Sequence, residues 1–341
     1  MLSVIIPCYN SGKYLPRLLD SLVDQHIDKA EMEVIISDDC SPEPYDDVLE
    51  RYKDKLTIIK TSTKYNCCPG NTRQAGVDVA RGRWYVFADH DDAFMPDVFE
   101  KVRAVIRKSK DAHMIVTDFI EVMPDTDEQI CEHSNAFGWT HGKFYNAKWW
   151  KSHGLHYKKD LKSHEDIYLS TLCTCALHED KDNGKIYLPI KSYKWTAHPE
   201  SLSRKEDKMF IETHFNEYLE ATGYAYLDFY KRNKDLNFAL FHCVAVALYA
   251  YFYTMGVVFR DPNGFDGSML TYSARYIKAL KDTLEISNTD LIRCTMVKNG
   301  EYYWETMQAA KVATGPYVPL WSFEQFLVQL PYEEEGGSPR E

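Results

Sequence analysis

Short apolar runs alternate with amphipathic stretches in the first part of the chain, up to about residue 205. The apolar runs are rich in β-branched and aromatic residues, as is typical of buried strands: Leu2–Ile6, Glu33–Ser37, Leu56–Ile59, Trp84–Ala88, Met114–Thr117 and Lys185–Ile190. The stretches between them carry helix-starting residues or apolar residues spaced by three and four, and predict helices: Leu15–Val23, Ser41–Tyr52, Thr72–Ala80, Pro96–Lys108 and Ile167–Leu177. Because strand and helix alternate, this part is predicted to be an α/β domain with a mostly parallel sheet flanked by helices.

The alternation is interrupted in places and then ends. The polar stretch Asp125–Asn135 is predicted to be an insertion, and Trp195–Arg204 a loop. From residue 206 the pattern is mainly helical and aromatic-rich. We therefore predict a catalytic domain over residues 1–205, a helical region over 206–332 with an acceptor or association role, and a disordered acidic tail over 333–341.

One carboxyl-terminal segment, Phe238–Phe259, has the length of a membrane span and contains no Asp, Glu, Lys or Arg. It also contains His242 and several tyrosines, and polar groups are costly in hydrocarbon. A buried helix is the preferred interpretation.

The net charge and the cysteines argue against some functions and indicate a cellular compartment. A formal charge of −11 argues against broad nucleic-acid binding, which depends on Lys and Arg neutralising phosphates. The nine cysteines show no zinc-type pairing, and the apolar start is too short for a signal peptide. These features predict reduced thiols in a cytoplasmic protein, with peripheral contact at the inner membrane face left open.

Carboxylates follow two of the predicted strands. Asp38 and Asp39 end the second strand, and Asp89, Asp91 and Asp92 follow Trp84–Ala88 directly. In a parallel sheet both ends lie on one edge, where ligands bind in open α/β folds. Crowded carboxylates repel one another, and Mg²⁺ or Mn²⁺ bound with a diphosphate would relieve the repulsion. The alternative interpretation is a solvated acidic turn that caps the helix near Pro96.

Five motifs in order resemble those of the family 2 glycosyltransferases, which are inverting enzymes of GT-A fold, and they cover roughly residues 1 to 205. They are Ser3–Asn10, Ile36–Ser41, Gly70–Gly76, the DxD-like segment Phe87–Asp92 and the base-motif-like segment His164–Asp166. Each motif alone is weak, whereas their order makes a strong match.

The resemblance implies a donor site for a nucleotide sugar, most simply a UDP-sugar. Pro7, Tyr9 and Asp39 match positions that hold the nucleobase, with Asn10 beside them on the donor side. A carboxylate accepts the uracil N–H while an aromatic ring covers the base. Arg73 is implied to lie near the phosphates, and Arg204 is a further phosphate candidate.

The resemblance also implies metal and catalytic residues. Asp91 matches the direct ligand of Mn²⁺ or Mg²⁺, Asp89 a residue that holds ribose or a metal-bound water, and His198 a loop histidine that touches metal or diphosphate in some relatives. Asp166, next to Glu165, matches the general base that takes the acceptor proton. Without the resemblance, Glu165 and Asp166 would be interpreted as acids that stabilise a helix start.

The sequence thus predicts a metal-dependent inverting transferase that glycosylates a hydroxyl of a glycan or lipid-linked glycan. Two alternatives stay open. One is a nucleotide-sugar-binding protein without transferase activity, and the other is a metal-dependent nucleotidyltransferase. The second should carry a glycine-rich phosphate loop after the first strand, which Pro7–Gly12 is not.

Overall fold

The structure is a computed structural model that describes residues 1–159, 161, 163–181, 184–198, 208–233, 236–260, 267–297, 317 and 319–331. The chain divides into two compact units, Met1–Arg204 and Lys205–Glu341. The predicted tail over 333–341 and Arg204 lie outside the described residues.

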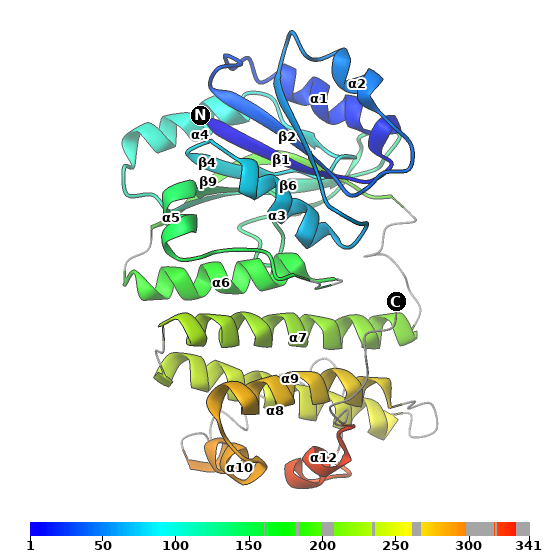
Figure 1. Cartoon of the computed structure of the whole chain (residues 1–341), viewed down its shortest axis with the longest axis vertical. Helices are drawn as coiled ribbons and strands as arrows, with labels where there is room; N and C mark the ends of the chain where they lie inside the picture. Colours follow the sequence, from blue (N-terminus) through cyan, green and yellow to red (C-terminus); the bar gives the residue numbers. More distant parts are fainter. Residues whose placement is uncertain are drawn as a thin grey trace. The chain divides into compact units, whose positions relative to one another are not determined.

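The N-terminal unit is built on one mixed sheet in the spatial order β3-β2-β1-β4-β8-β6-β9-β5, with β7 paired to β6 (Figure 1). Its strands are β1 (Leu2–Cys8), β2 (Met32–Asp38), β3 (Thr57–Ser62), β4 (Trp84–Phe87), β5 (Ala93–Phe94), β6 (Met114–Val122), β7 (Gln129–His133), β8 (Lys143–Asn146) and β9 (Lys185–Thr196). Strands β1 to β4 pair in parallel, with Leu2 beside both Met32 and Trp84. The α/β fold class predicted from the sequence is confirmed.

Helices cover both faces of this sheet: α1 (Leu15–Val23), α2 (Asp46–Glu50), α3 (Pro69–Val79), α4 (Val98–Lys108), α5 (Ala147–Ser152) and α6 (Glu165–Glu179), with a 3-10 turn at Ser11–Lys13. Side chains alternate along a strand. Val4 and Ile6 of β1 pack into one core with Leu18 of α1. Ile5 points to the other face, where α3 lies so close that a Cβ on Gly76 would meet Ile5 Cγ2 at 2.5 Å. The two layers therefore follow from the apolar pattern of β1.

Several predicted boundaries were wrong: α3 begins at Pro69 rather than Thr72, β3 ends at Ser62 rather than Ile59, and three further differences lie around one region. Strand β6 runs to Val122, the insertion contains β7, and β9 runs to Thr196 through part of the expected loop. Pairing explains these differences, because β7 is antiparallel to β6 and β9 is parallel to β6 through Val122. Helix α2 is shorter than predicted, since it starts at Asp46 rather than near Ser41.

The C-terminal unit is helical over its described residues, as predicted: α7 (Lys208–Asn233), α8 (Leu236–Arg260), α9 (Ser268–Leu284), α10 (Asn288–Val297) and α12 (Phe323–Gln329). Its apolar core includes Leu248 and Phe252 of α8, Ile277 of α9 and Phe326 of α12. Among the described helices, Phe241–Arg260 has the length and composition to cross a bilayer, and 83% of its most apolar window is buried inside the protein. A core helix passes the same test, so this feature is weak evidence for a membrane span.

Candidate active site

The candidate site lies at the carboxyl edge of the parallel strands. Pro7 is near the end of β1, Asp39 directly follows β2, and Asp89 follows β4. The strand ends converge because β1 pairs with both β2 and β4 in parallel. The structure thus brings together groups that are up to eighty-two residues apart in the sequence, from Pro7 to Asp89.

Asp39 is buried and accepts hydrogen bonds from the loop that follows β3. Its carboxylate is 8% exposed and accepts hydrogen bonds from Thr63 Oγ1 at 2.8 Å and from the Cys67 amide at 3.3 Å. Tyr9 is 47% exposed. Asn10 has a left-handed backbone (φ 50°), and its amide donates to Ser41 Oγ at 2.9 Å. A carboxylate can accept more bonds than these, so Asp39 keeps capacity for a ligand N–H.

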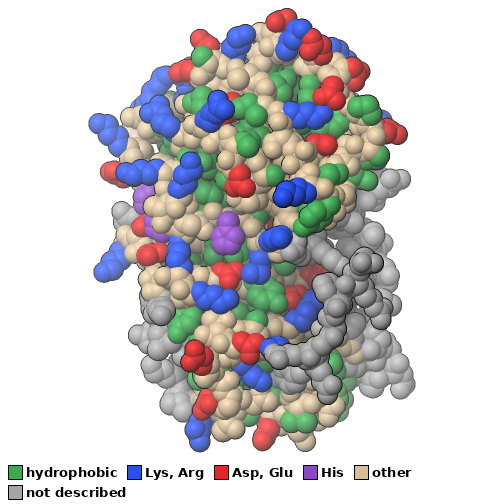
Figure 2. All heavy atoms as spheres, viewed as in Figure 1, with side chains coloured by type: hydrophobic (Ala, Val, Ile, Leu, Met, Phe, Trp, Pro, Cys, Tyr) green, Lys and Arg blue, Asp and Glu red, His purple; other side chains and the backbone are tan. Residues whose placement is uncertain are grey.

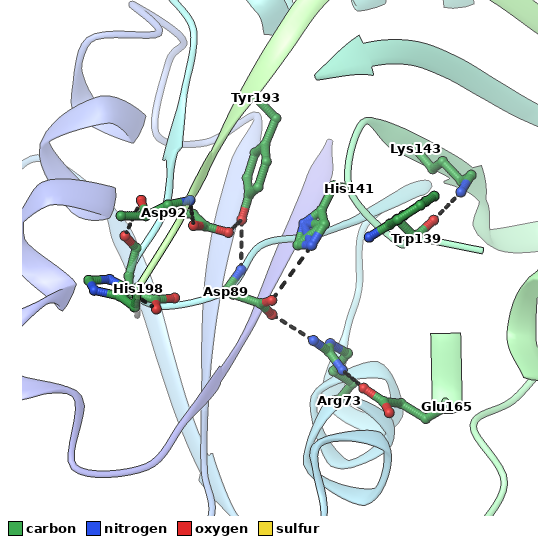
Figure 3. A network of polar contacts seen from close by, with 11 residues as sticks. Arg73, Asp89, Asp92, Trp139, His141, Lys143, Glu165, Tyr193 and His198 are labelled. Atoms are coloured by element: carbon green, nitrogen blue, oxygen red, sulfur yellow. Dashed lines mark hydrogen bonds and ion pairs between the residues drawn. The ribbon is translucent and has the colours of Figure 1, made fainter. Parts of the chain in front are cut away.

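Arg73 of α3 links the two acidic motifs (Figure 3). Its Nη2 lies 2.6 Å from Asp89 Oδ1, and its Nη1 lies 2.5 Å from Glu165 Oε1. Although burial lowers the pKa of Arg73, Asp89 and Glu165 raise it well above its ordinary value. Burial raises the pKa of Asp89, but Arg73 and His141 outweigh this and lower it. Arg73 is therefore a buried cation that fixes Asp89 and Glu165 relative to each other.

Asp89 and Asp91, the two acids of the DxD-like motif, have different partners. A turn closes at Asp89–Asp92, where the Asp92 amide donates to the Asp89 carbonyl at 3.2 Å. Asp89 contacts Arg73, whereas Asp91 Oδ2 faces His198 Nε2 at 3.4 Å. Asp92 is anchored in the protein, since it accepts from Tyr193 Oη and from the Thr196 amide, each at 2.8 Å.

Asp91 and His198 have the composition of a metal site. His198 Nε2 is buried and has no hydrogen-bond partner, so it is available as a ligand. A carboxylate oxygen beside an imidazole nitrogen suits Mn²⁺, and such ions commonly complete their shell with phosphate oxygens and water. Asp89, Asp92 and His141 also converge, with ligand atoms within 4.8 Å of one another. Arg73 and Tyr193 already engage two of these three, so the pair Asp91–His198 fits a metal better.

Asp166 occupies the first turn of α6. His164 precedes it with a left-handed backbone (φ 58°), which is uncommon outside glycine, and the helix begins at Glu165. Helix α6 approaches α3 closely, since a Cβ on Gly70 would lie 3.0 Å from Glu165 Cβ. Burial, and next the charge of Glu165, raise the pKa of Asp166 to about 7. A carboxylate with this pKa can take up a proton near neutral pH.

Several site residues were missed in the sequence. His141 is buried, stacks on Tyr193 with ring centroids 5.0 Å apart, and lies 3.8 Å from Asp89 Oδ2. Burial lowers its pKa to about 4, so the ring is neutral at pH 7. Lys143, two residues further along the chain, begins β8, and burial lowers its pKa to about 8. No local motif marks these residues, because their role depends on strand pairing across the predicted insertion.

The fold is that of a GT-A glycosyltransferase domain. Residues 3–169 match the family described as glycosyl transferase family 2, so the N-terminal unit is a domain of this family. The family match favours a glycosyltransferase over the nucleotidyltransferase alternative.

Similar proteins support the same class. TarS of Staphylococcus aureus, named a poly(ribitol-phosphate) beta-N-acetylglucosaminyltransferase, is 28% identical over 177 residues, which are 48% of this chain and 30% of TarS. An uncharacterized glycosyltransferase of Haemophilus influenzae is 39% identical over 116 residues, 34% of this chain and 37% of that protein. The structure of S. aureus TarS 1–349 with UDP matches 96% of this chain and 90% of that one, with a TM-score of 0.60 and 20% identity, a likeness of fold. The chain thus aligns with less than a third of the TarS sequence.

Proposed function

We propose that this chain is an inverting glycosyltransferase that moves a sugar from a UDP-sugar to a hydroxyl of a glycan or a polyol-phosphate chain. The observation that carries the proposal is the bridge by Arg73 between Asp89 and Glu165. This bridge joins the donor-side acids to the acid motif that contains Asp166. S. aureus TarS was solved with UDP and with UDP-GlcNAc, which supports a uridine donor.

The donor would bind along the carboxyl edge. Asp39 would accept the N3–H of uracil, and Tyr9 would cover the ring. Asp89 would accept from a ribose hydroxyl while Arg73 keeps its carboxylate in place. Arg73 already holds two carboxylates, so we assign it a positioning role rather than the direct phosphate contact expected from the sequence.

Asp166 would be the general base. As the acceptor oxygen attacks the anomeric carbon, Asp166 takes its proton, and the bond from this carbon to the diphosphate oxygen breaks on the opposite face. The nucleoside diphosphate leaves with the bonding electrons, and the configuration inverts. Glu165 acts through Arg73 and is a positioning residue.

Asp91 and His198 would hold Mn²⁺. Bound there, the ion supplies positive charge that stabilises the diphosphate leaving group. The protein's own part is to keep the carboxylate and the imidazole facing one another.

A thermal-shift titration tests the donor site first. UDP should raise the melting temperature, and more so with Mn²⁺, since a ligand of the folded state stabilises it by mass action. The Mn²⁺-dependent part should vanish in Asp91→Asn and His198→Ala and persist in the exposed-site control Asp47→Asn. Equal shifts with UDP, GDP and CMP would contradict the uridine assignment.

Product analysis separates a transferase from a binding protein. With a UDP-sugar and an acceptor chain, the wild-type protein should release UDP and form a product of inverted anomeric configuration. Donor binding without UDP release in the presence of acceptors would support the nucleotide-sugar-binding alternative. A product of retained configuration would contradict the role of Asp166.

A further inference from the structure

A second concave site lies at the amino edge of the same sheet, away from the candidate active site. It is a groove of about 1020 Å³ between α4, α5 and the first residues of β1 and β4. Strand β1 has seven residues, and at about 3.3 Å of rise per residue it separates the two edges by about 20 Å. None of the candidate donor or catalytic residues lines this groove.

The groove is strongly basic although the whole chain carries a charge of −11. Six cationic side chains from the β4 start, α4, α5 and the loop after α4 line it: Arg83, Arg103, Arg107, Lys110, Lys148 and Lys151. Glu31 is the acidic member of the lining and pairs with Arg103. In Figure 2, Lys and Arg side chains are gathered on the side of this unit where Figure 1 shows α4 and α5.

The other five cations have no carboxylate within 4.0 Å among the described residues of the chain. The nearby buried acid Glu33 already accepts three hydrogen bonds at Oε1, from Ser3 Oγ and from the amides of Arg81 and Gly82. A concentration of unpaired cations produces a local positive potential that attracts anions, and a concave surface strengthens it.

The shape and the charge together favour a linear polyanion. A flat membrane surface would meet the rim rather than the floor of a groove, whereas a flexible chain can lie inside it. Ile106 and Ala147 add apolar surface to the lining, which suits the carbon segments between phosphates. Cations supplied by separate elements match charges that repeat along a chain better than one compact anion.

We propose that this groove binds a linear phosphodiester polymer and holds a segment of the acceptor chain remote from the reacting hydroxyl. The inference rests on the proposed function for its biological meaning, and TarS, which is named a poly(ribitol-phosphate) transferase, is consistent with such an acceptor. A polymer held at the amino edge keeps its other units at high local concentration near the carboxyl edge.

Binding of long-chain inorganic polyphosphate by the full chain tests the groove without catalysis. The double variant Arg107→Glu/Lys151→Glu alters both walls, and Arg51→Glu/Lys55→Glu makes the same change in net charge at exposed residues outside the groove. The groove variant should bind at least tenfold more weakly, and the control should stay within twofold of wild type. The slope of log K against log salt should fall by about 1.4 in the groove variant, at about 0.7 per lost contact.

Any of the following three outcomes would contradict the proposal. Equal weakening in both variants would show a diffuse effect of net charge. Inorganic phosphate that competes as well as polyphosphate, at equal phosphate concentration, would show a single-anion site. Binding to phosphatidylglycerol vesicles that depends on the groove, without binding to polyphosphate, would show a membrane-docking surface. Melting temperatures of both variants establish that they are folded.

The proposed function is tested by separate measurements. UDP binding and sugar transfer by the wild-type protein decide that proposal, whatever the polyphosphate result. If transfer occurs, the groove variant should raise KM for a long polymer acceptor and leave kcat unchanged, because the groove acts on binding alone.

Discussion

At the carboxyl edge of the sheet the central charged groups are buried and paired, whereas at the amino edge they are exposed and largely unpaired. Arg73 is 6% exposed and contacts two carboxylates at 2.5 and 2.6 Å. Arg107 and Lys151 in the basic groove are exposed, and no described carboxylate pairs with them. The two edges belong to the same strands, so they differ in whether their charged side chains are buried and paired or exposed and unpaired.

The difference separates two uses of a charged residue. A buried charge must be paired when the protein folds, and it then fixes geometry before any ligand arrives. An exposed charge costs little free energy of folding because it stays hydrated. Its field extends into the solvent and is screened by salt. The carboxyl edge is therefore suited to chemistry at defined atoms, and the amino edge to attracting a polymer.

The largest effect should come from removing the proposed base. Asp166→Asn keeps the size of the side chain but cannot accept the proton, so kcat should fall by roughly 10²- to 10⁴-fold. The UDP-induced thermal shift should be unchanged, since Asp39 and Asp91 are intact. Steady-state kinetics with Asp47→Asn as control check this, and activity of Asp166→Asn near wild type would remove Asp166 from the mechanism.

Arg73 offers the next test, and it compares the two edges directly. Arg73→Met leaves Asp89 and Glu165 without their buried partner, so the free energy of unfolding should fall by about 3–5 kcal/mol. The matched change at the amino edge, Arg107→Met, should stay within about 0.5 kcal/mol of wild type. Urea denaturation measures both.

A double variant identifies the cause of the Arg73 effect. Arg73→Met/Glu165→Gln removes one of the stranded charges and should recover part of the lost stability. If Arg73→Met and Arg107→Met were equally mild, the contrast between a paired buried edge and an open edge would be wrong.

The strands that carry the candidate site could be predicted because their signals are local. Apolar runs such as Leu2–Ile6 and Trp84–Ala88 are read within a few residues, and the acids that follow them are adjacent in the sequence. The fold class, β1, β2 and β4 were accordingly confirmed.

The side of the site that contains Tyr193 and His141 could not be predicted, because it depends on pairing between strands that are far apart in the sequence. Strand β7 has no strong apolar pattern and forms by antiparallel pairing with β6, and the end of β9 is aligned by the same strand. The pairing of β9 with β6 and with β5 brings Tyr193 to Asp92 and His141 to Tyr193. In the sequence alone, Tyr193 and His141 look like ordinary core or loop residues.

Asp39 gives a smaller effect on donor selection. Asp39→Asn should weaken UDP binding by roughly 1.5–3 kcal/mol, the range for a hydrogen bond to a charged group. CDP lacks the N3–H that Asp39 would accept, so its affinity should change less, and the preference for UDP over CDP should shrink. Isothermal titration with both nucleotides measures this, and an unchanged preference would remove Asp39 from base recognition.

The last test is a pH dependence with opposite signs for activity and stability. Burial, and next Glu165, raise the pKa of Asp166 to about 7, so the base loses its free form as the pH falls below 7. The value of kcat/KM should then fall about tenfold per pH unit below this pKa. Because the folded pKa lies above the unfolded one, Asp166 stabilises the fold most at low pH, and this contribution is lost as the pH rises from about 4 to about 7. Activity should thus rise over the range in which stability declines. Asp166→Asn should remove this part of the stability profile, whereas Asp47→Asn should keep it. A wild-type activity profile flat between pH 5 and 8 would mean that another group takes the proton.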